Sequence, residues 1–324
     1  MIEKPLVTVI SPVYNTGKYF LRGVKSLQNQ TFDQGLIQHI IVDDGSTDDS
    51  VKLIEKFIEQ ENYKCTFIKN PKNEGLCKTL NKGLSLAMGK YVAYLPDDMW
   101  KPNKLAEEVK LFEKLPDDYG VIYTNVDFCD ENDAVFKENV KHQYAGINGN
   151  VHEHLIKNKN FIFGSAVLIK RSVFDKHGYY DESLPFEDTA FWLKISKTVL
   201  FQHLDKPNVI YRRLSDHSNL SMVLVKNSRI KIEDSIILLR HLIDANDHKS
   251  LIADKVISNL TEYCLQNNIA LFQNHFDNEA DLFHLAEVKK QKKIHLVLFI
   301  KNFFKRKNKR FSFRDMFYFA RKSM

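Results

Sequence analysis

The first 125 residues alternate short apolar segments, rich in β-branched residues, with longer segments of helical periodicity. Parallel strands need crossover connections, usually helices, and parallel strands that are buried on both faces form continuous apolar runs. The alternation therefore predicts an α/β fold with a mainly parallel sheet flanked by helices. The predicted strands cover 7–13, 37–42, 65–69, 91–95 and 120–125, and the predicted helices cover 19–30, 47–60, 76–88 and 103–115.

The alternation weakens after Asp127. Further strands are predicted at 163–169, 200–203 and 208–212, and a further helix at 186–198. From Val225 to Val288 the sequence is strongly helical with one broad apolar face, which is typical of a face that packs against a core. No internal repeat or low-complexity linker interrupts the chain. We expect three parts, an α/β domain at 1–222, a helical region at 223–288 packed on it, and a basic amphipathic tail at 289–324.

Adjacent carboxylates follow two of the predicted strands. Asp43 and Asp44 end one strand, and Asp97 and Asp98 come after Tyr91–Leu95. Ligands of open α/β sheets bind beyond the carboxyl ends of the strands, so these side chains are expected to face a crevice. Carboxylate oxygens suit Mg²⁺ or Mn²⁺, which bind through one or two carboxylates together with substrate phosphates. Each segment alone also fits a simple turn that caps the next helix.

The positive charge of the chain is concentrated at its end. Residues 289–324 contain 13 Lys and Arg and one Asp, so this tail carries +12, and the preceding 288 residues carry −6 because the whole chain carries +6. Phenylalanines recur at helical spacing between the basic clusters, which is typical of a helix that lies on an anionic membrane. A solvated basic end with aromatics packed on the domain is the alternative. A basic tail on an acidic domain does not indicate nucleic-acid binding.

The cysteines and the apolar segments bear on the compartment. The four cysteines are widely spaced and fit neither a metal site nor a disulfide framework, which suits a reducing compartment. The amino terminus enters a predicted strand without the pattern of a signal peptide. The apolar runs are shorter than a membrane span. We expect a cytoplasmic protein that is peripheral on the inner face of the cell membrane.

Five groups of residues occur in a recognisable order: 7–15, 41–50, 73–75, 96–98, and 178–183 with 186–188. In order and spacing they resemble the motifs of family 2 glycosyltransferases, which have the GT-A fold, a nucleotide-binding mainly parallel sheet flanked by helices. The resemblance covers roughly residues 5–215, about two thirds of the chain, and leaves out the helical region and the tail. Pro96-Asp97-Asp98 is closest to the short Asp-Asp motif of spore-coat polysaccharide members.

The resemblance implies a set of nucleotide-binding residues. Tyr14 would stack near the base, and Asp44 would accept a hydrogen bond from the base imide. Asn73 and Lys78 would lie near the ribose and the diphosphate. The complete set is Pro12, Tyr14, Asn15, Asp44, Asn73, Lys78 and Asp97.

The same resemblance implies a metal ligand and a catalytic base. Asp98 would bind Mn²⁺ or Mg²⁺ directly, with Asp97 nearer the ribose or the metal-bound waters. Asp188 would act as the general base, and the helix amino terminus at which it lies favours an ionised carboxylate. Glu187 and Asp181 are the fallback carboxylates. Simple helix capping is the alternative for Glu187 and Asp188.

The segment Tyr211–Ser221 resembles the mobile loop that closes over the diphosphate in such enzymes. Arg212, Arg213 and His217 are the candidates in this loop for binding a phosphate or completing the metal shell. The other histidines show no spacing typical of zinc ligands.

The expected activity is metal-dependent and inverting. A sugar would move from a nucleotide-sugar donor, a UDP-sugar, to a hydroxyl of a polysaccharide or glycolipid acceptor in cell-surface glycan synthesis. A nucleotidyltransferase is one alternative, although the glycine-rich phosphate loop usual in that class is missing. A non-catalytic nucleotide-sugar-binding or membrane scaffold protein is the other. The donor sugar and the acceptor depend on the loops at 125–160 and 161–165, which no motif defines.

Overall fold

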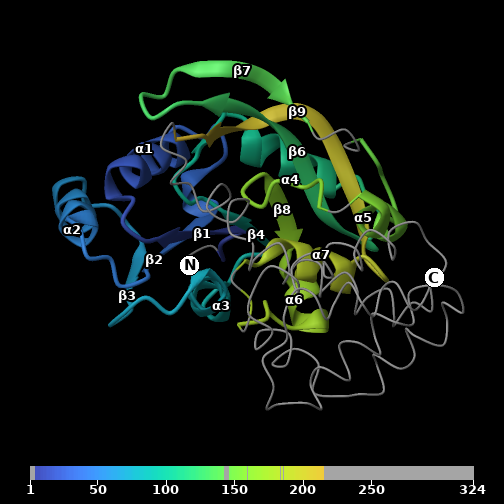
Figure 1. Cartoon of the computed structure of the whole chain (residues 1–324), viewed down its shortest axis with the longest axis horizontal. Coiled ribbons are helices and arrows are strands. Elements are labelled where there is room, and N and C mark those ends of the chain that lie inside the picture. The colour runs from blue at the N-terminus through green and yellow to red at the C-terminus, as the bar shows by residue number, and fades with distance from the viewer. Residues whose placement is uncertain (1–3, 142–145, 159, 183, 185, 215–324) are drawn as a thin grey trace, which may run out of the picture. The chain divides into compact units, whose positions relative to one another are not determined.

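A nine-stranded sheet organises the part of the chain that the computed structural model describes (Figure 1). The described residues are 4–141, 146–158, 160–182, 184 and 186–214, and they fall within one compact unit, Met1–Ile230. The predicted helical region, the predicted tail and His217 lie outside the described residues, so the three predicted parts of the chain stay predictions.

The strands occur in the sheet order β3-β2-β1-β4-β8-β6-β9-β5, with β7 paired to β6. Their bounds are β1 (Val7–Val13), β2 (Ile37–Asp43), β3 (Thr66–Lys69), β4 (Tyr91–Tyr94), β5 (Met99–Trp100), β6 (Tyr119–Cys129), β7 (Val135–Val140), β8 (Val167–Lys170) and β9 (Leu200–Arg212). The helices are α1 (Gly17–Gln28), α2 (Ser50–Gln60), α3 (Leu76–Ser85), α4 (Lys104–Phe112), α5 (His152–Asn158), α6 (Arg171–His177) and α7 (Asp188–Ile195).

The predicted α/β class is confirmed. Strands β3, β2, β1 and β4 pair in parallel, and so do β6 and β9. Strand β8 is antiparallel to both β4 and β6, and β5 and β7 are antiparallel to their neighbours. The parallel pairs place the carboxyl ends of β1, β2 and β4 at one edge of the sheet.

The predicted strand 120–125 continues to Cys129 in β6, and three further predicted strands differ from the structure in their bounds. The predicted strand 163–169 begins only at Val167, because the Ala166 N–H bonds the Phe163 carbonyl at 2.9 Å and closes a turn. The predicted strands 200–203 and 208–212 form the single strand β9. Its register with β6 shifts between Leu204 and Pro207, so the intervening residues bulge out without ending the strand.

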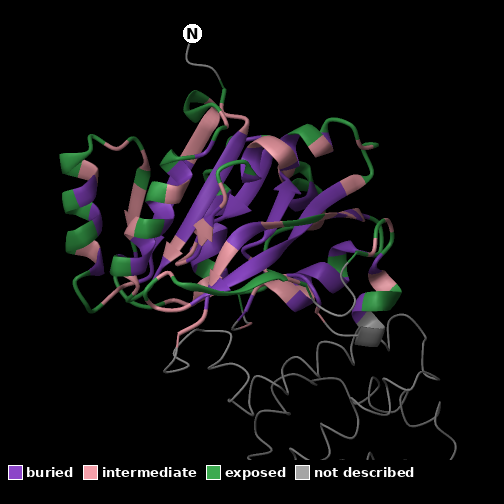
Figure 2. Ribbon diagram, turned by 90° about the horizontal axis from the view of Figure 1, so that it is seen from above, coloured by how far each residue is buried: buried purple, intermediate pink, exposed green. Residues whose placement is uncertain are grey.

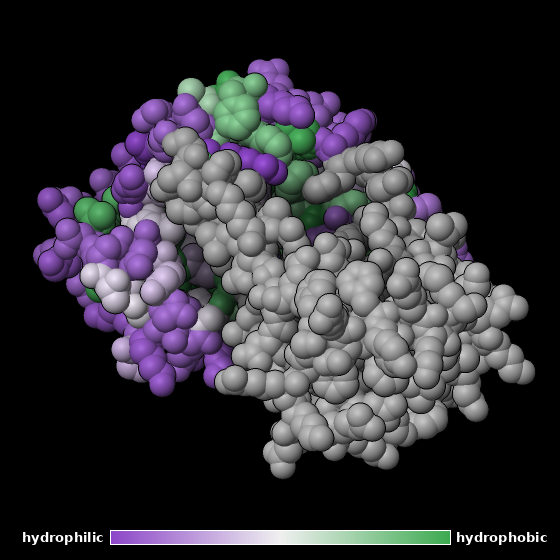
Figure 3. Space-filling view, viewed as in Figure 1, coloured by the Kyte–Doolittle hydropathy of each residue, from purple (hydrophilic) through white to green (hydrophobic). Residues whose placement is uncertain are grey.

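Five short elements among the described residues were not predicted: the 3-10 helix Gln34–Leu36, β5, β7, α5 and α6. Strand β7 is almost entirely exposed, so it lacks the apolar alternation by which half-buried strands are recognised. Val135 and Phe136 of this strand are exposed, and Figure 3 shows apolar residues gathered over β7. Strand β5 has only two residues, which is too short for any pattern.

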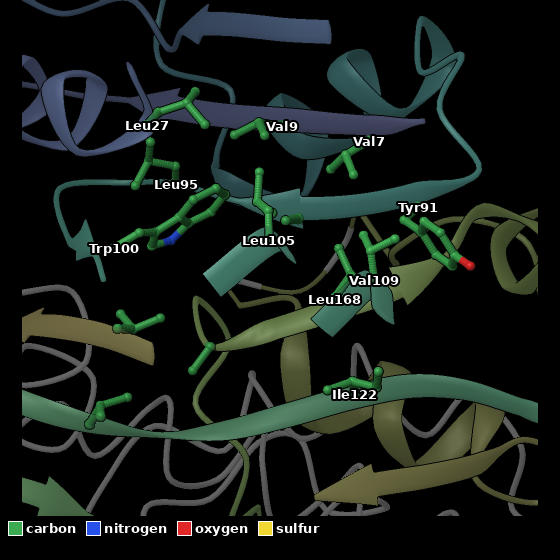
Figure 4. Close-up of a cluster of buried hydrophobic side chains, with 14 of the residues drawn as sticks. Val7, Val9, Leu27, Tyr91, Leu95, Trp100, Leu105, Val109, Ile122 and Leu168 are labelled. Carbon is green, nitrogen blue, oxygen red and sulfur yellow. The ribbon is translucent and has the colours of Figure 1, made fainter. Parts of the chain in front are cut away.

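The core lies between the sheet and its helices (Figure 2). Strands β1 and β4 are buried because helices cover the sheet, so they read as continuous apolar runs. Leu27 of α1 and Leu105 and Val109 of α4 pack against Val9 and Leu168 of the sheet (Figure 4). A second cluster joins α1 and α2 to the strand tips through Phe20, Ile41 and Ile54. No helix among the described residues is long and apolar enough to cross a membrane.

Helix α4 contains an ion pair that is completely enclosed. Lys104 Nζ lies 2.6 Å from Glu108 Oε2, and both side chains are 0% exposed. The Lys104 ammonium also lies 5.0 Å from the centroid of the Trp100 ring, and Asn208 Nδ2 donates to Glu108 at 3.4 Å. Burial raises the pKa of Glu108, and the charge of Lys104 opposes that shift.

Replacing Glu108 by alanine should lower the free energy of unfolding by about 3–5 kcal/mol, because the Lys104 charge would stay buried without its partner. Denaturant unfolding followed by circular dichroism measures the change. The matched control is Lys52→Ala, which removes an exposed ion pair with Asp49 in α2 and should change the free energy of unfolding by less than about 1 kcal/mol. If the free energy of unfolding fell equally in the two variants, the buried Lys104–Glu108 ion pair would not have the importance that is assigned to it.

Candidate active site

The tips of β1 and β2 are joined by hydrogen bonds that shape the first part of the site. The Asp44 N–H donates to the Val13 carbonyl at 2.7 Å. Asn15 Oδ1 accepts a hydrogen bond from the Thr47 N–H at 2.8 Å, and the Asn15 N–H donates to Ser46 Oγ at 2.9 Å. Asn15 has φ of 55°, in the left-handed region that asparagine tolerates better than most residues. Asn15 therefore connects the turn after β1 to the turn after β2 by hydrogen bonds.

The turn after β2 requires Gly45. Its φ is +70°, and a Cβ there would lie 2.4 Å from the backbone carbon of Lys72. The Asp43 carboxylate closes the turn by accepting the N–H groups of Gly45 and Ser46, each at 3.1 Å. The segment before α3 can therefore lie directly against the turn.

Asp44 is buried at the centre of this arrangement, with 4% of its surface exposed. Its Oδ1 accepts hydrogen bonds from Asn70 Nδ2 and the Glu74 N–H, both at 2.9 Å, and its Oδ2 accepts the Gly75 N–H at 3.0 Å. Lys82 Nζ donates to Asn70 Oδ1 at 2.7 Å and fixes that amide. The carboxylate thus uses three of its about four acceptor positions within the chain.

Sequence reasoning missed Asn70 and Lys82. Asn70 directly follows the strand predicted at 65–69, so the rule that drew attention to Asp44 would also have found Asn70. Lys82 gives no such signal, because it is one of several lysines on a predicted helix.

The remaining predicted nucleotide-binding residues lie around Asp44. Tyr14, on the turn after β1, is 45% exposed, and Pro12 is half-buried. Asn73 directly precedes the two residues whose backbone N–H groups donate to Asp44. Lys78 lies in the first turn of α3. Both side chains are exposed. The structure thus collects these residues at the tips of β1, β2 and β3.

Asp97 and Asp98 follow β4, which pairs directly with β1. Asp98 is 2% exposed, and its Oδ1 accepts the Arg212 N–H at 2.8 Å. Burial raises the pKa of Asp98 to about 7, and the neighbouring Asp97 charge adds to the shift. Burial also raises the pKa of Asp97. In the described part of the chain, no group of three or more His, Cys, Asp or Glu residues is placed to hold a metal ion.

Arg212 supports this turn, and its expected role in binding a phosphate or completing the metal shell stays a prediction. Its side chain is 0% exposed, and its guanidinium lies 2.7 Å from Asp133 Oδ1 and donates to the Asp97 carbonyl at 3.1 Å. The guanidinium also lies 4.5 Å from the centroid of the Tyr19 ring. Because its donors are enclosed among groups of the chain, Arg212 serves to hold the Asp97–Asp98 turn. Arg213 is half-buried and stacks over Phe128, and its expected role stays a prediction.

Glu187 and Asp188 open α7, as predicted. Asp188 Oδ2 accepts a hydrogen bond from Asn160 Nδ2 at 2.6 Å, and Asp188 Oδ1 accepts the Thr189 N–H at 2.5 Å. Burial raises the pKa of Asp188, and these hydrogen bonds oppose that shift. Burial and then the charge of Asp188 raise the pKa of Glu187 to about 8. The two adjacent carboxyl groups therefore oppose each other's ionisation, and the hydrogen bonds from Asn160 and Thr189 favour the ionised form of Asp188.

The segment from Asn160 to Ser165 connects the two carboxylate pairs. Asn160 contacts Asp188, and a Cβ on Gly164 would lie 2.7 Å from Glu187 Oε1. Ser165 lies close to Asp98. One short segment thus lies close to both Asp98 and Asp188. Sequence reasoning placed this segment near the substrates but singled out none of these three residues.

Asp181, the second fallback carboxylate, is exposed on the segment between α6 and α7. The preceding residue, Tyr180, donates its N–H to Asn81 Oδ1 at 3.1 Å, and Asn81 Nδ2 donates to the Tyr180 carbonyl at 2.9 Å. This reciprocal pair ties the segment to α3.

Comparison with solved structures supports the fold. The crystal structure of S. aureus TarS 1–349 in complex with UDP-GlcNAc has a TM-score of 0.64 at 16% identity, covering 92% of this chain and 87% of that one. The mannosyltransferase PcManGT from Pyrobaculum calidifontis, in complex with GDP-Man and Mn²⁺, has a TM-score of 0.55 at 15% identity, covering 93% and 85%. At these identities the likeness shows the fold alone.

Sequence comparisons add the family. An uncharacterised glycosyltransferase of Methanocaldococcus jannaschii is 28% identical over 225 residues, which span 68% of this chain and 76% of the relative. Glycosyltransferase GlyG of Streptococcus pneumoniae is 28% identical over 230 residues, which span 65% and 71%. The model of glycosyl transferase family 2 matches residues 8–178, more than half of the chain. With the strand-tip motifs and the two carboxylate pairs in place, this chain belongs to glycosyl transferase family 2.

Proposed function

We propose that this glycosyltransferase is metal-dependent and inverting, and that it transfers a sugar from a UDP-sugar to a hydroxyl of a polysaccharide or glycolipid acceptor in cell-surface glycan synthesis. The observation that carries the proposal is that one short segment, 160–165, lies close to both carboxylate pairs. One pair follows β4 at the edge of the sheet where the carboxyl ends of β1 and β2 lie, and the other begins α7. Donor activation and acceptor deprotonation need such separate sites.

The hydrogen bonds of Asp44 support a uracil base. Three chain donors already occupy this carboxylate, which leaves one acceptor position on Oδ2. Uracil presents one donor, its imide N–H, whereas guanine presents two donors on the same edge. Tyr14 is exposed beside this position and is available for stacking. TarS is described with UDP and with UDP-GlcNAc, and PcManGT with GDP-Man, so the fold accommodates either nucleotide.

Asp97 and Asp98 fit a divalent cation. The pKa of Asp98 is raised to about 7 by burial and by the Asp97 charge, so the two carboxylates resist ionising together unless a cation is near them. Asp98 would bind Mn²⁺ or Mg²⁺, and the remaining ligands would come from the diphosphate and water. The cation would stabilise negative charge on the departing nucleoside diphosphate. PcManGT is described with Mn²⁺.

Asp188 accepts the proton of the acceptor hydroxyl in this proposal. The hydroxyl oxygen forms a bond to the anomeric carbon while the bond from that carbon to the diphosphate oxygen breaks, and the electron pair leaves with the nucleoside diphosphate. One direct displacement inverts the anomeric configuration. Lys78, exposed in the first turn of α3, offsets charge on the leaving diphosphate. Protonated Glu187 does not compete for the proton.

We also propose that residues 289–324 attach the enzyme to the inner face of the cell membrane in the cytoplasm. The support is the sequence pattern alone. The tail carries a net charge of +12, and its phenylalanines recur at helical spacing. Such a helix binds anionic headgroups through its charge and the acyl boundary through its aromatic face.

Release of UDP from one sugar donor should depend on Mn²⁺ and on Asp98. A panel of UDP-, GDP- and dTDP-sugars, assayed for nucleoside diphosphate release with a glycan acceptor mixture, identifies the donor. Asp98→Ala should lower the release at least about 100-fold. Asp175→Ala, which removes an exposed ion pair of α6, should leave it unchanged. Donor binding without release in the wild type would favour a non-catalytic binding protein.

Asp188→Asn should abolish transfer while donor binding is retained, because the amide keeps the shape but cannot take a proton. We expect kcat to fall about 100- to 10,000-fold with an unchanged calorimetric Kd for the donor. Glu187→Gln should lower kcat far less, since the pKa of Glu187 is raised to about 8 and its carboxyl is then a poor base at neutral pH. Full transfer by Asp188→Asn would remove the mechanism.

Deleting residues 289–324 should abolish co-sedimentation with vesicles that contain anionic lipid and should spare release of nucleoside diphosphate. Neutral vesicles serve as the control, because binding through +12 of charge requires anionic headgroups. Unchanged sedimentation of the shortened protein would refute membrane attachment by this tail.

A further inference from the structure

Both oxygens of the Asp188 carboxylate are held by hydrogen bonds, but from different parts of the chain. Oδ1 accepts from the N–H of Thr189 at 2.5 Å and from its hydroxyl at 3.2 Å. Oδ2 accepts from Asn160 Nδ2 at 2.6 Å. Thr189 belongs to the same helical turn and moves with Asp188. Asn160 is therefore the donor that fixes the carboxylate relative to the rest of the fold.

Asn160 is itself held in place. Its Oδ1 accepts the Ile162 N–H at 2.9 Å, which defines the orientation of the amide and directs its N–H₂ group at Asp188. Phe161 and Ile162 are each 2% exposed, and the Phe161 ring packs against Tyr123 of β6. The segment that carries Asn160 is thus anchored in the core on one side. On its other side Gly164 leaves no room for a Cβ against Glu187.

We propose that Asn160 is a positioning residue for the reaction, and that its amide orients the Asp188 carboxylate so that the remaining lone pair of Oδ2 points at the acceptor hydroxyl. This inference rests on the proposed function, because it takes Asp188 as the base. It goes further by giving a role to a residue that has no motif.

The charges around Asp188 determine what loss of Asn160 would do. Glu187 lies on the same turn. Burial and then the charges of nearby acidic groups, Glu187 and Asp188 among them, raise the pKa of Cys77 in α3. Tyr94 of β4 and Tyr180 face Glu187. These groups are neutral or acidic, so hydrogen bonds carry much of the stabilisation of the ionised carboxylate. Burial raises the pKa of Asp188 and the Asn160 hydrogen bond lowers it, so removal of that bond should raise the pKa.

The test compares the pH dependence of kcat in the wild type, Asn160→Ala and Asn160→Asp. A base works only when deprotonated, so a higher pKa of Asp188 moves the acid limb of the profile to higher pH. Asn160→Ala should show this shift and a loss of kcat of about 10- to 100-fold at neutral pH, the range for a hydrogen bond to a charged group. Asn160→Asp should shift the limb further, because it adds a like charge. The calorimetric Kd for the donor should not change in either variant.

Asn103→Ala is the matched control, since it removes an asparagine that accepts a hydrogen bond from Thr31 at the start of α4. It should leave the acid limb where it is in the wild type. Thermal unfolding checks that each variant is folded. An acid limb unchanged in both Asn160 variants would overturn the proposal.

Failure of the proposed function is recognised separately, as absence of transfer by the wild type with every donor. In that event the pKa of Asp188 is measured by NMR titration of its carboxyl carbon in the wild type and in Asn160→Ala. A higher pKa of Asp188 in the variant supports the proposal that the Asn160 amide positions this carboxylate. An unchanged pKa overturns that proposal.

Discussion

Parallel pairing of β1 with both β2 and β4 is the constraint on which the site depends. It places three carboxyl ends at one edge of the sheet, where the strand-tip segments must satisfy one another. Asp44 bonds two backbone N–H groups before α3, and Asn15 accepts one from the turn after β2. A buried carboxylate is stable only with such donors, so the loops at this edge of the sheet are held by the hydrogen bonds of Asp44 and Asn15.

The carboxylates of the site differ in how they are supported, and this separates their chemistry. Asp44 is saturated by chain donors apart from one position, which suits recognition of a single N–H. Asp98 lies beside Asp97 with its pKa raised, which suits a cation. Hydrogen bonds from Asn160 and Thr189 favour the ionised form of Asp188, whereas burial and the Asp188 charge raise the pKa of Glu187. One residue type thus has three different environments, and the three proposed roles follow from them.

Sequence patterns predicted the elements whose burial imposes a pattern. The buried strands β1, β2 and β4 and the amphipathic helices α1 to α4 lie close to their predicted bounds. Strand β7 was missed because it is exposed and has no apolar alternation, and β9 was divided because a bulge interrupts its pattern. Arg212 was named as a candidate for binding a phosphate or completing the metal shell because its segment resembles a mobile loop, and that resemblance did not reveal its hydrogen bonds to Asp98 and to the Asp97 carbonyl.

By itself the sequence determined the α/β class, the strand-tip motifs and the order of the acidic residues, because these follow from local periodicity and short spacings. Only the tertiary structure decided which side chains share a hydrogen bond across long separations. Asn160 reaches Asp188, Asn70 reaches Asp44, and the Arg212 backbone reaches Asp98. No local pattern encodes such pairs, because they depend on how the sheet brings distant segments to one edge.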